Sequence, residues 1–489
     1  MAVYLYSILG LVLLLVVFLV VRTLIFSQGF KPVEPVQGVE VDGEKIAQHL
    51  ASAIRVQTIS IDESTPASSD SLKTFRQTLR KMYPLIHKKL ELKLINEHSL
   101  LYKWQGSDPQ LKPVLFMAHQ DVVPAHESTL KDWVHPPFEG VIQDGYVWGR
   151  GAMDIKNQVI AVMESVEHLL SQDHKPQRTI YMAFGHDEEI GGPRGSRQVA
   201  AWLKEQGVQL EAVVDEGGML ISGFLPGVDN PVAMVGVAEK GYLTLELTAE
   251  SEPGHSSTPP PDTAICILAR GITRLEANPM PANPAVLLPQ LKAVGKSSSF
   301  MNRLFYANLW LFGGFVRRMM EKKPQTNASM RTTTAVTMIN GGVKDNILPC
   351  EVTAKVNFRL LPQNPIEDVY KHTRHVIQDE RIKVGMNKDL CWNASPVSPS
   401  SGRVFESLAR TIRQFFGNVP VAPTTGLGAT DARYYYQICE NVYRFTPLQV
   451  QREDLKRVHG LNERIGVADL AKMVQFFTQL IKVWSSSLE

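Results

Sequence analysis

Apolar positions in the first half of the chain follow two alternating patterns. Short apolar runs, typical of buried strands, are separated by segments in which apolar residues recur at helical spacing. This alternation predicts an α/β fold with a mostly parallel central sheet and helices on both faces. The predicted strands cover 113–118, 179–184 and 212–214, and the predicted helices cover 42–56, 157–170, 196–206 and 467–483.

The pattern changes near residue 240. Residues 242–249 and 352–360 alternate apolar and polar side chains, as half-exposed antiparallel strands do, and residues 264–275 have helical spacing. An inserted α+β unit is therefore predicted over 239–360, and the α/β pattern then resumes.

Residues 299–321 form a helical, aromatic segment within this predicted insertion. Its Phe300, Leu304, Phe305 and Trp310 would line a tunnel if the protein bound a long acyl chain. An apolar stripe at helical spacing is more often packed against its own domain or a second subunit, so this second interpretation is favoured.

The first segment of the chain differs from the rest. Residues 3–21 contain no charged side chain, and about 20 apolar residues cross a bilayer as a helix. A cleaved secretory signal would need a basic start and a small-residue cleavage site, and neither is evident. The prediction is a single-pass N-terminal membrane anchor over 1–27 and a stalk over 28–43. Arg22 and Lys31 mildly favour a cytoplasmic body, but two charges leave the side of the membrane open.

The composition of the chain mainly excludes other classes of protein and other kinds of partner. The 489 residues, 44% of them apolar, are enough for about two or three folded units. Basic and acidic residues nearly balance, at 51 and 49, and no long basic run is present, so nucleic acid is not an expected partner. The four cysteines lie far apart, which argues against a disulfide scaffold or a cysteine-bound zinc.

Acidic and histidine residues gather where the predicted strands end. Ligands of open α/β sheets bind at the carboxyl ends of the strands, so these residues predict one common site. In the first cluster, His119 could bind a metal while Asp121 orients the ring from behind. An ordinary turn after a strand would give the same short motif.

The next three clusters are rich in carboxylates. Asp154 follows a glycine-rich turn and precedes a helix, where it could either bridge two cations or cap the helix. Glu188 and Glu189 follow a buried strand, and adjacent carboxylates there are costly unless a cation or a function holds them. Asp215 and Glu216 repeat this arrangement, and a solvated acidic turn is the alternative.

A further histidine, His459, lies in a glycine-containing loop near the end of the chain. Together, two histidines and several carboxylates suit a pair of zinc ions. Paired metals about 3.5–4 Å apart can share a water, lower its pKa and polarise a carbonyl. Mg²⁺ or Mn²⁺ would also suit the carboxylates, but the histidines favour zinc.

With these ordered motifs, the chain resembles the co-catalytic zinc aminoacylase/carboxypeptidase family of metallopeptidases, closest to its Gly-X carboxypeptidase and N-fatty-acyl-amino-acid hydrolase branch. The resemblance covers about residues 45–485. It implies a zinc-peptidase catalytic domain in two parts, 44–238 and 361–489, with 239–360 inserted as a lid that often also dimerises.

The resemblance also implies roles for single residues. Glu188 would be the general base, Asp121 would orient His119, and the Asp154–Ile155 peptide would be cis. For the fourth motif, related sequences favour Glu216 over Asp215 as the ligand. The implied metal ligands are His119, Asp154 as the bridge, Glu189, Glu216 or Asp215, and His459.

Four implied site residues lie outside the metal motifs. His255 would stabilise the oxyanion, commonly in the site of a partner subunit, although its sequence context alone reads as a turn. Asn346 and Arg359 would bind the substrate carboxylate, for which Arg offers a two-pronged contact. Gly428 belongs to a glycine-rich loop that would line the substrate pocket.

The leading hypothesis is a di-zinc hydrolase of amide bonds next to a free carboxylate. It would use two Zn²⁺ per subunit, Glu188 and a water between the metals to cleave short peptides or N-acyl amino acids. The membrane, through the N-terminal helix, and a second copy, through the lid, are the other expected partners. The alternative is an inactive membrane-tethered binding protein, against which the intact ligand and base positions argue.

Overall fold

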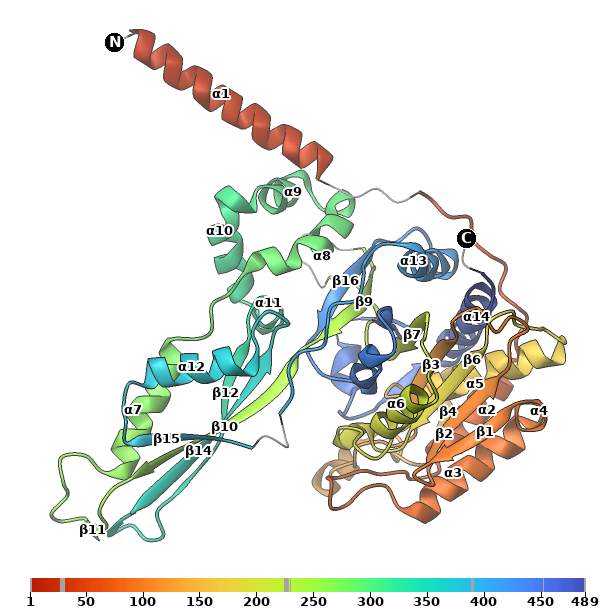
Figure 1. Cartoon of the computed structure of the whole chain (residues 1–489), viewed down its shortest axis with the longest axis horizontal. Coiled ribbons are helices and arrows are strands. Elements are labelled where there is room, and N and C mark those ends of the chain that lie inside the picture. Colours follow the sequence, from red (N-terminus) through yellow and green to blue (C-terminus); the bar gives the residue numbers. More distant parts are fainter. Residues whose placement is uncertain are drawn as a thin grey trace.

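In the computed structural model, most of the strands belong to two sheets, one of ten strands and one of four (Figure 1). Residues 1 and 27 of the predicted anchor and 28–30 of the predicted stalk lie outside the described residues. The structure describes residues 2–26, 31–223, 228, 230–387, 391–451 and 453–487.

The larger sheet has ten strands. These are β1 (Glu91–Ile95), β2 (Ser99–Trp104), β3 (Val114–His119), β6 (Ile180–Gly185), β7 (Ala212–Asp215), β8 (Leu220–Ile221), β9 (Val232–Glu239), β16 (Val421–Gly426), β17 (Val442–Arg444) and β18 (Gln449–Val450). Their order is β1-β2-β6-β3-β7-β17-β9-β8-β18, and β16 pairs with β9. The central run β6-β3-β7-β17 is parallel, which confirms the predicted sheet.

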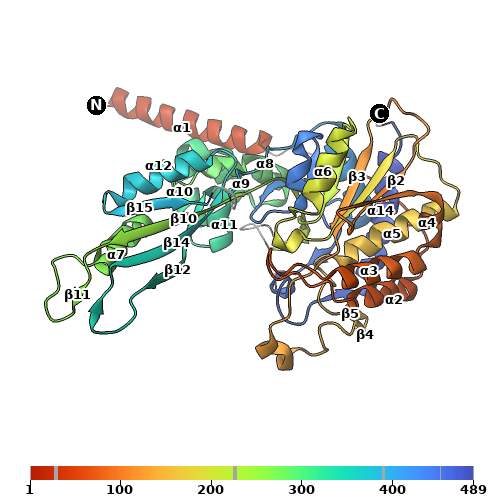
Figure 2. The ribbon, with the colours of Figure 1, turned by 60° about the horizontal axis from the view of Figure 1, so that its bottom comes forward.

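Alternate residues of each central strand enter two separate cores. On β3, Val114 and Phe116 pack in one hydrophobic cluster, and Leu115 and Met117 pack in the other. Figure 2 shows α5 and α6 on opposite sides of these strands, which confirms helices on both faces. The helices of this unit are α2 (Gly43–Ile54), α3 (Ser69–Met82), α4 (Pro84–Lys89), α5 (Lys156–Ser171), α6 (Ser196–Glu205), α13 (Arg403–Phe416) and α14 (Val467–Trp484).

The smaller sheet is antiparallel, with the order β12-β14-β10-β15. Its apolar face is covered by two helices, and a short ribbon of β11 and β13 extends from its far end (Figure 1). The elements are β10 (Gly241–Glu250), β11 (Gly254–His255), α7 (Ala264–Ala277), β12 (Thr333–Gly341), β13 (Ile347–Leu348), β14 (Glu351–Leu360), α12 (Ile366–Ile377) and β15 (Ile382–Met386).

The predicted boundary at residue 360 falls inside this unit. β15 lies beyond it and still pairs with β10, with Leu245 opposite Met386. Trp392 then forms a further bridge to Tyr242. We therefore propose that the inserted unit extends to about residue 394.

A group of short helices is inserted between α7 and β12. It contains α8 (Leu288–Ala293), α9 (Phe300–Ala307), α10 (Leu309–Glu321) and α11 (Pro324–Met330). The predicted helical segment 299–321 is thus two helices that meet at Asn308. Phe305 packs against Phe312 and Phe315, with ring centroids 5.2 and 5.0 Å apart, while Phe300 and Trp310 are exposed. The first helix of the chain, α1 (Ala2–Ile25), projects from this group (Figure 1).

Candidate active site

The carboxyl ends of three parallel strands bring the predicted residues together. His119 is the last residue of β3, Glu188 and Glu189 open the turn after β6, and Glu216 directly follows β7. Because β6, β3 and β7 are adjacent and parallel, their ends share one edge of the sheet. The position of each residue at a strand end and the parallel pairing of the strands therefore bring these side chains to the same place.

The two remaining residues of this group come from loops that Glu463 ties together. Its carboxylate is fully buried, and Oε1 accepts the backbone N–H groups of Gly151, Met153 and Asp154 at 3.0, 2.7 and 3.1 Å. Oε2 lies 2.6 Å from Nη1 of Arg150. Since Glu463 follows His459 in the same loop, one contact positions both loops. Sequence reasoning missed this role, and only its place in the His459 motif could have suggested it.

Strand pairing and glycine support the same turn. Strands β4 (Val141–Gln143), β5 (Tyr146–Trp148) and β19 (Arg464–Gly466) form a small sheet in which Arg464 pairs with Trp148. At Gly149, φ is +147° and a Cβ would lie 2.6 Å from Ile54, so only glycine fits. The Asp154–Ile155 peptide is cis, as expected from the resemblance.

Asp154 lies between two groups of candidate ligand atoms. Its Oδ1 is 3.3 Å from Nε2 of His119, which is also 3.1 Å from Oε1 of Glu216. Its Oδ2 is 3.0 Å from Nε2 of His459, which is also 3.2 Å from Oε2 of Glu189. Within each group of three, the candidate ligand atoms lie within 4.8 Å of one another.

These residues fit a pair of divalent metals. Nε2 of His119 and Oε1 of Glu189 are buried and have no hydrogen-bond partner of suitable geometry in the described part of the chain. Folded proteins rarely leave buried polar atoms in this state unless water or an ion satisfies them. Imidazole nitrogens together with carboxylate oxygens are the donor set that zinc accepts.

Asp121 supports this arrangement through its backbone and its side chain. Nδ1 of His119 lies 2.9 Å from the carbonyl oxygen of Asp121 and 3.4 Å from its carboxylate. The same carboxylate accepts the backbone N–H groups of Glu188 and Glu189 at 3.1 and 3.2 Å. One buried carboxylate therefore positions both the histidine and the acidic turn beside it.

The structure separates the two residues that the sequence left open as alternatives. Asp215 turns its carboxylate toward the backbone, where it accepts the N–H groups of Glu216 and Ala432, both at 2.9 Å. Glu216 lies among the candidate ligands instead. The geometry therefore favours Glu216 for a metal and gives Asp215 a supporting position.

The charges of the cluster shift its proton affinities. Burial raises the pKa of Glu216 to about 8, although His119 opposes the shift. Burial lowers the pKa of His119, but Glu216 and neighbouring carboxylates outweigh it and raise that pKa well above its usual value. Hydrogen bonds to Asp154 and Glu189 raise the pKa of His459 to about 10. Near pH 7 the cluster therefore holds protons that a metal would displace.

Three of the predicted site residues outside the metal motifs lie away from the cluster or at its exposed margin. His255 is exposed on β11, where its Nδ1 accepts the backbone N–H of Ser257 at 3.1 Å. Figure 1 places β11 at the end of the smaller sheet remote from β3 and β6. Asn346 lies beside it, and its carbonyl accepts the N–H of Ser256. Gly428 is exposed in the loop after β16.

Arg359 belongs to a stack of side chains that joins the two units. It lies on the polar face of the smaller sheet, lining a cavity of about 780 Å³, with its guanidinium carbon 4.7 Å from the ring of Tyr242. Tyr242 stacks on Trp392 at 5.0 Å, and the guanidinium carbon of Arg433 lies 4.2 Å from the Trp392 ring. Arg433 donates to the carbonyl of Gly191, in the turn that carries Glu189. Sequence reasoning missed Trp392 and Arg433.

The fold and this cluster define a class of protein. An open α/β sheet that brings histidines and carboxylates into two groups sharing one aspartate is an arrangement typical of metallohydrolases. The profile of Peptidase family M20/M25/M40 matches residues 115–483. The chain therefore belongs to this family, which confirms the resemblance and makes it a hydrolase of the metallopeptidase class.

The sequences of several known proteins are similar to this one over nearly its whole length. It is 40% identical to the probable carboxypeptidase S-like 2 of Dictyostelium discoideum, over 90% of this chain and 85% of that protein. It is 37% identical to the human N-fatty-acyl-amino acid synthase/hydrolase PM20D1, over 90% and 88%. It is 34% identical to carboxypeptidase S of Saccharomyces cerevisiae, over 89% and 83%.

Solved structures share the fold. The M20 family metallo-carboxypeptidase Sso-CP2 from Sulfolobus solfataricus superposes with a TM-score of 0.66 at 17% identity, over 91% of this chain and all of that one (100%). Human carnosine dipeptidase 1 gives 0.62 at 16% identity, over 91% and 96%. The predicted α/β domain with an inserted lid is therefore confirmed as the fold class.

We predict that Glu463→Ala destabilises the protein and weakens metal binding together. Removing one partner of a buried ion pair costs about 3–5 kcal/mol, and three backbone N–H groups lose their acceptor as well. The checks are the thermal unfolding midpoint and the metal content of the full chain in detergent. Glu276→Ala, on the exposed face of α7, is the control. Equal midpoints for the two variants would contradict the assigned role.

Zn²⁺ binding at pH 7 should release protons. His119 and His459 have raised pKa values, and the pKa of Glu216 is about 8, so all three hold protons that ligands must lose. Affinity should therefore increase as the pH rises from 6 through 8. Calorimetric titrations in two buffers of different ionisation enthalpy measure the release, and identical heats in both would contradict it.

Proposed function

We propose that this protein hydrolyses the amide bond next to a free carboxylate, in a short peptide or in an N-acyl amino acid. The observation that carries the proposal is Asp154, whose two oxygens each face a separate group of candidate ligands beside Glu188. Relatives named as carboxypeptidases and as N-fatty-acyl-amino acid hydrolases support both substrate types.

The proposal includes two Zn²⁺ per subunit, which would supply an acidified water and polarise the scissile carbonyl. His119 and Glu216 would hold one ion and Glu189 and His459 the other, with Asp154 shared. The two histidine nitrogens favour zinc over magnesium.

Glu188 is the residue that we assign to proton transfer. Its Oε2 lies 3.8 Å from Nε2 of His119, at the edge of the cluster. Burial raises the pKa of Glu188 well above its usual value, with His119 opposing the shift, and this suits a group that must hold a proton during part of the cycle. Its backbone is fixed by Asp121, which limits where the carboxylate can move. It would accept the proton of the attacking water and pass it to the leaving amine.

The carboxylate of the substrate would bind to the lid. Arg359 faces the polar cavity of the smaller sheet and carries a permanent charge that forms two parallel bonds to a carboxylate. In the proposal, Asn346, which lies beside Ser256 at the opposite end of β14 from Arg359, adds its contact from a second copy of the chain, and Gly428 lets the backbone approach the substrate.

The oxyanion would be stabilised by His255 of a second copy of the chain. His255 is exposed at the end of the smaller sheet remote from the cluster of its own chain (Figure 1). A homodimer formed through the lid would bring it to the other active site, so each site would need both subunits.

We also propose that α1 anchors the protein in a membrane. One helix in the described part of the chain, residues 3–25, is long and apolar enough to span a bilayer. A helix of this type could also be a signal sequence, but α1 has a specific contact on the body. Leu19 and Thr23 are buried there, and the side chain of Asn308 donates to both. A segment removed after export would need no such contact.

Glu188→Gln should reduce kcat by roughly 10²–10⁴-fold with unchanged zinc content, because it removes the proton acceptor but keeps the shape of the side chain. We would assay the zinc-loaded full chain on a Gly-Leu dipeptide, acetyl-methionine and oleoyl-phenylalanine, with Glu276→Gln as the matched control. The preferred compound identifies the substrate class. A zinc-loaded wild type that cleaves none of the three would refute the proposed function.

Two inactive variants should complement each other if the site is shared. Glu188→Gln and His255→Ala carry different tags, and mixed dimers are purified through both. One of their two sites then contains both intact residues, so the mixed dimer should show about half of the wild-type rate. Full activity of His255→Ala alone, or a mixed dimer no more active than its parents, would rule out the shared site.

A further inference from the structure

The end of α1 is fixed to the joint between α9 and α10. The side chain of Asn308 donates to the carbonyl of Leu19 at 3.3 Å and to Oγ1 of Thr23 at 3.4 Å. The guanidinium of Arg22 donates to the carbonyl of Ala307 at 3.1 Å. Any bilayer that α1 crosses therefore has a set position relative to these two helices.

An aromatic contact indicates the depth of this joint. Phe18 packs edge-on against Trp310, with ring centroids 6.3 Å apart. Residues 3–21 contain no charge, and a hydrocarbon core of about 30 Å takes about 20 residues at 1.5 Å each. Phe18 therefore lies within the span, and Trp310 beside it lies at the level of the bilayer boundary.

The α9–α10 pair presents an unpartnered apolar face at this level. Five of its large apolar side chains are between 43 and 58% exposed, and several exposed apolar side chains on neighbouring helices often mark a contact with a membrane or another protein. They are Phe300, Met301, Trp310, Leu311 and Phe315. The basic residue Arg303 and the pair Arg317 and Arg318 lie on the same two helices.

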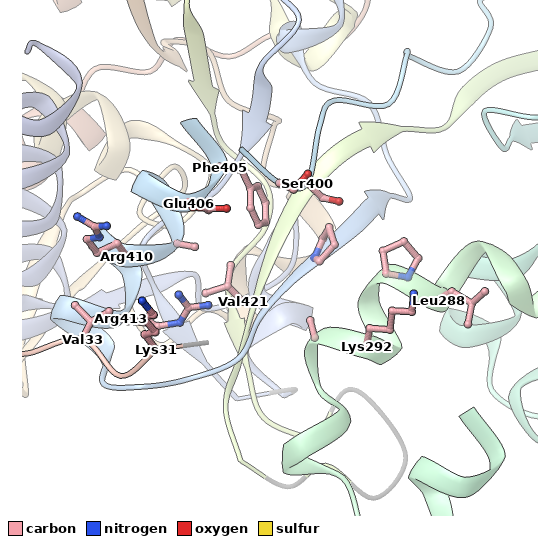
Figure 3. A pocket seen from close by; sticks show the side chains of 15 residues that line it. Lys31, Val33, Leu288, Lys292, Ser400, Phe405, Glu406, Arg410, Arg413 and Val421 are labelled. Atoms are coloured by element: carbon pink, nitrogen blue, oxygen red, sulfur yellow. The ribbon is translucent and has the colours of Figure 1, made fainter. Parts of the chain in front are cut away.

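The excess of basic residues around this face favours its contact with a negatively charged surface. Residues 282–331 contain eight basic residues and one acidic residue, although the whole chain is nearly balanced. Basic residues also predominate in the lining of a cavity of about 690 Å³ between α8 and α13 (Figure 3). Its lining includes Lys31, Lys292, Arg410 and Arg413, against one acidic residue, Glu406. Lys31 follows α1 in the sequence, so this cavity combines the segment after α1 with α8 and α13.

We propose that α9 and α10 are a second membrane-binding element. Their apolar face lies in the headgroup and acyl boundary of the bilayer that α1 crosses, and the surrounding lysines and arginines contact anionic lipid headgroups. We assign lipid as the partner of this apolar face, because the face adjoins α1, whose apolar composition suits a lipid environment. The inference rests on the proposed anchor and is independent of the proposed hydrolysis.

The test uses the full chain in nanodiscs of anionic phospholipid that contain a lipid with a photoreactive group in its acyl chain. After irradiation, mass spectrometry maps the adducts. We expect adducts in residues 300–315 as well as in α1, and none at Ile339 or Val343, which are exposed but lie on the smaller sheet and the turn after it. Adducts confined to α1 would overturn the inference and leave the anchor intact. A mature protein that lacks α1 would refute the anchor itself.

A matched pair of variants separates insertion from folding. Trp310→Glu with Phe315→Glu places charge on the proposed lipid face, and Met338→Glu with Ile339→Glu places the same charge on an exposed face of β12. The first variant should lose adducts in 300–315 down to the level of the Ile339 peptide in wild type, keep those in α1 and unfold at the wild-type temperature. The second should keep both sets. Cross-links between two differently labelled copies through 300–315, in place of lipid adducts, would show a protein interface and overturn the inference.

Discussion

The active site depends on buried carboxylates that accept backbone N–H groups. Glu463 holds the turn before Asp154, and Asp121 holds the turn of Glu188 and Glu189. Because these acceptors fix the backbone, the negatively charged side chains that follow cannot move apart to relieve their repulsion. Burial raises the pKa values of Glu188, Glu189 and Glu216, whereas at Asp154 burial is outweighed by hydrogen bonds from the two histidines, which lower the pKa. A divalent metal bound here would displace the protons that the raised pKa values retain.

Features of the site that depend on short stretches of sequence could be predicted, whereas features that depend on contacts between distant residues could not. His119, Glu189 and Glu216 stand at ends of buried strands, and their meeting required only that β3, β6 and β7 be parallel neighbours. Glu463 could not be found in this way, because its contact with Asp154 joins residues 309 positions apart. A contact between residues so far apart produces no periodic pattern in the local sequence. The stack of Trp392 and Arg433 was missed for the same reason, since it joins separate units.

The inserted lid shows a second limit of prediction from the sequence. Its long strands alternate clearly, but β15 has five residues, one of them glycine, and gives too short a pattern to be recognised as part of that sheet. The predicted end at residue 360 therefore fell too early. His255 shows the opposite case, in which the family motif was recognisable but its position in the fold was not. Its exposed position on β11, remote from the cluster, is the reason that we propose a second copy of the chain to complete the site.

The N-terminal segment contacts both units of the protein. α1 docks on helices of the inserted lid, whereas the residues after it bind the larger unit, where the backbone N–H of Val33 donates to Asn418 and the side chain of Gln475 donates to the carbonyl of Val39. The described residues before and after 27–30 therefore contact different units of the protein. The anchor proposed for α1 would therefore hold the inserted unit at the bilayer more directly than the larger unit.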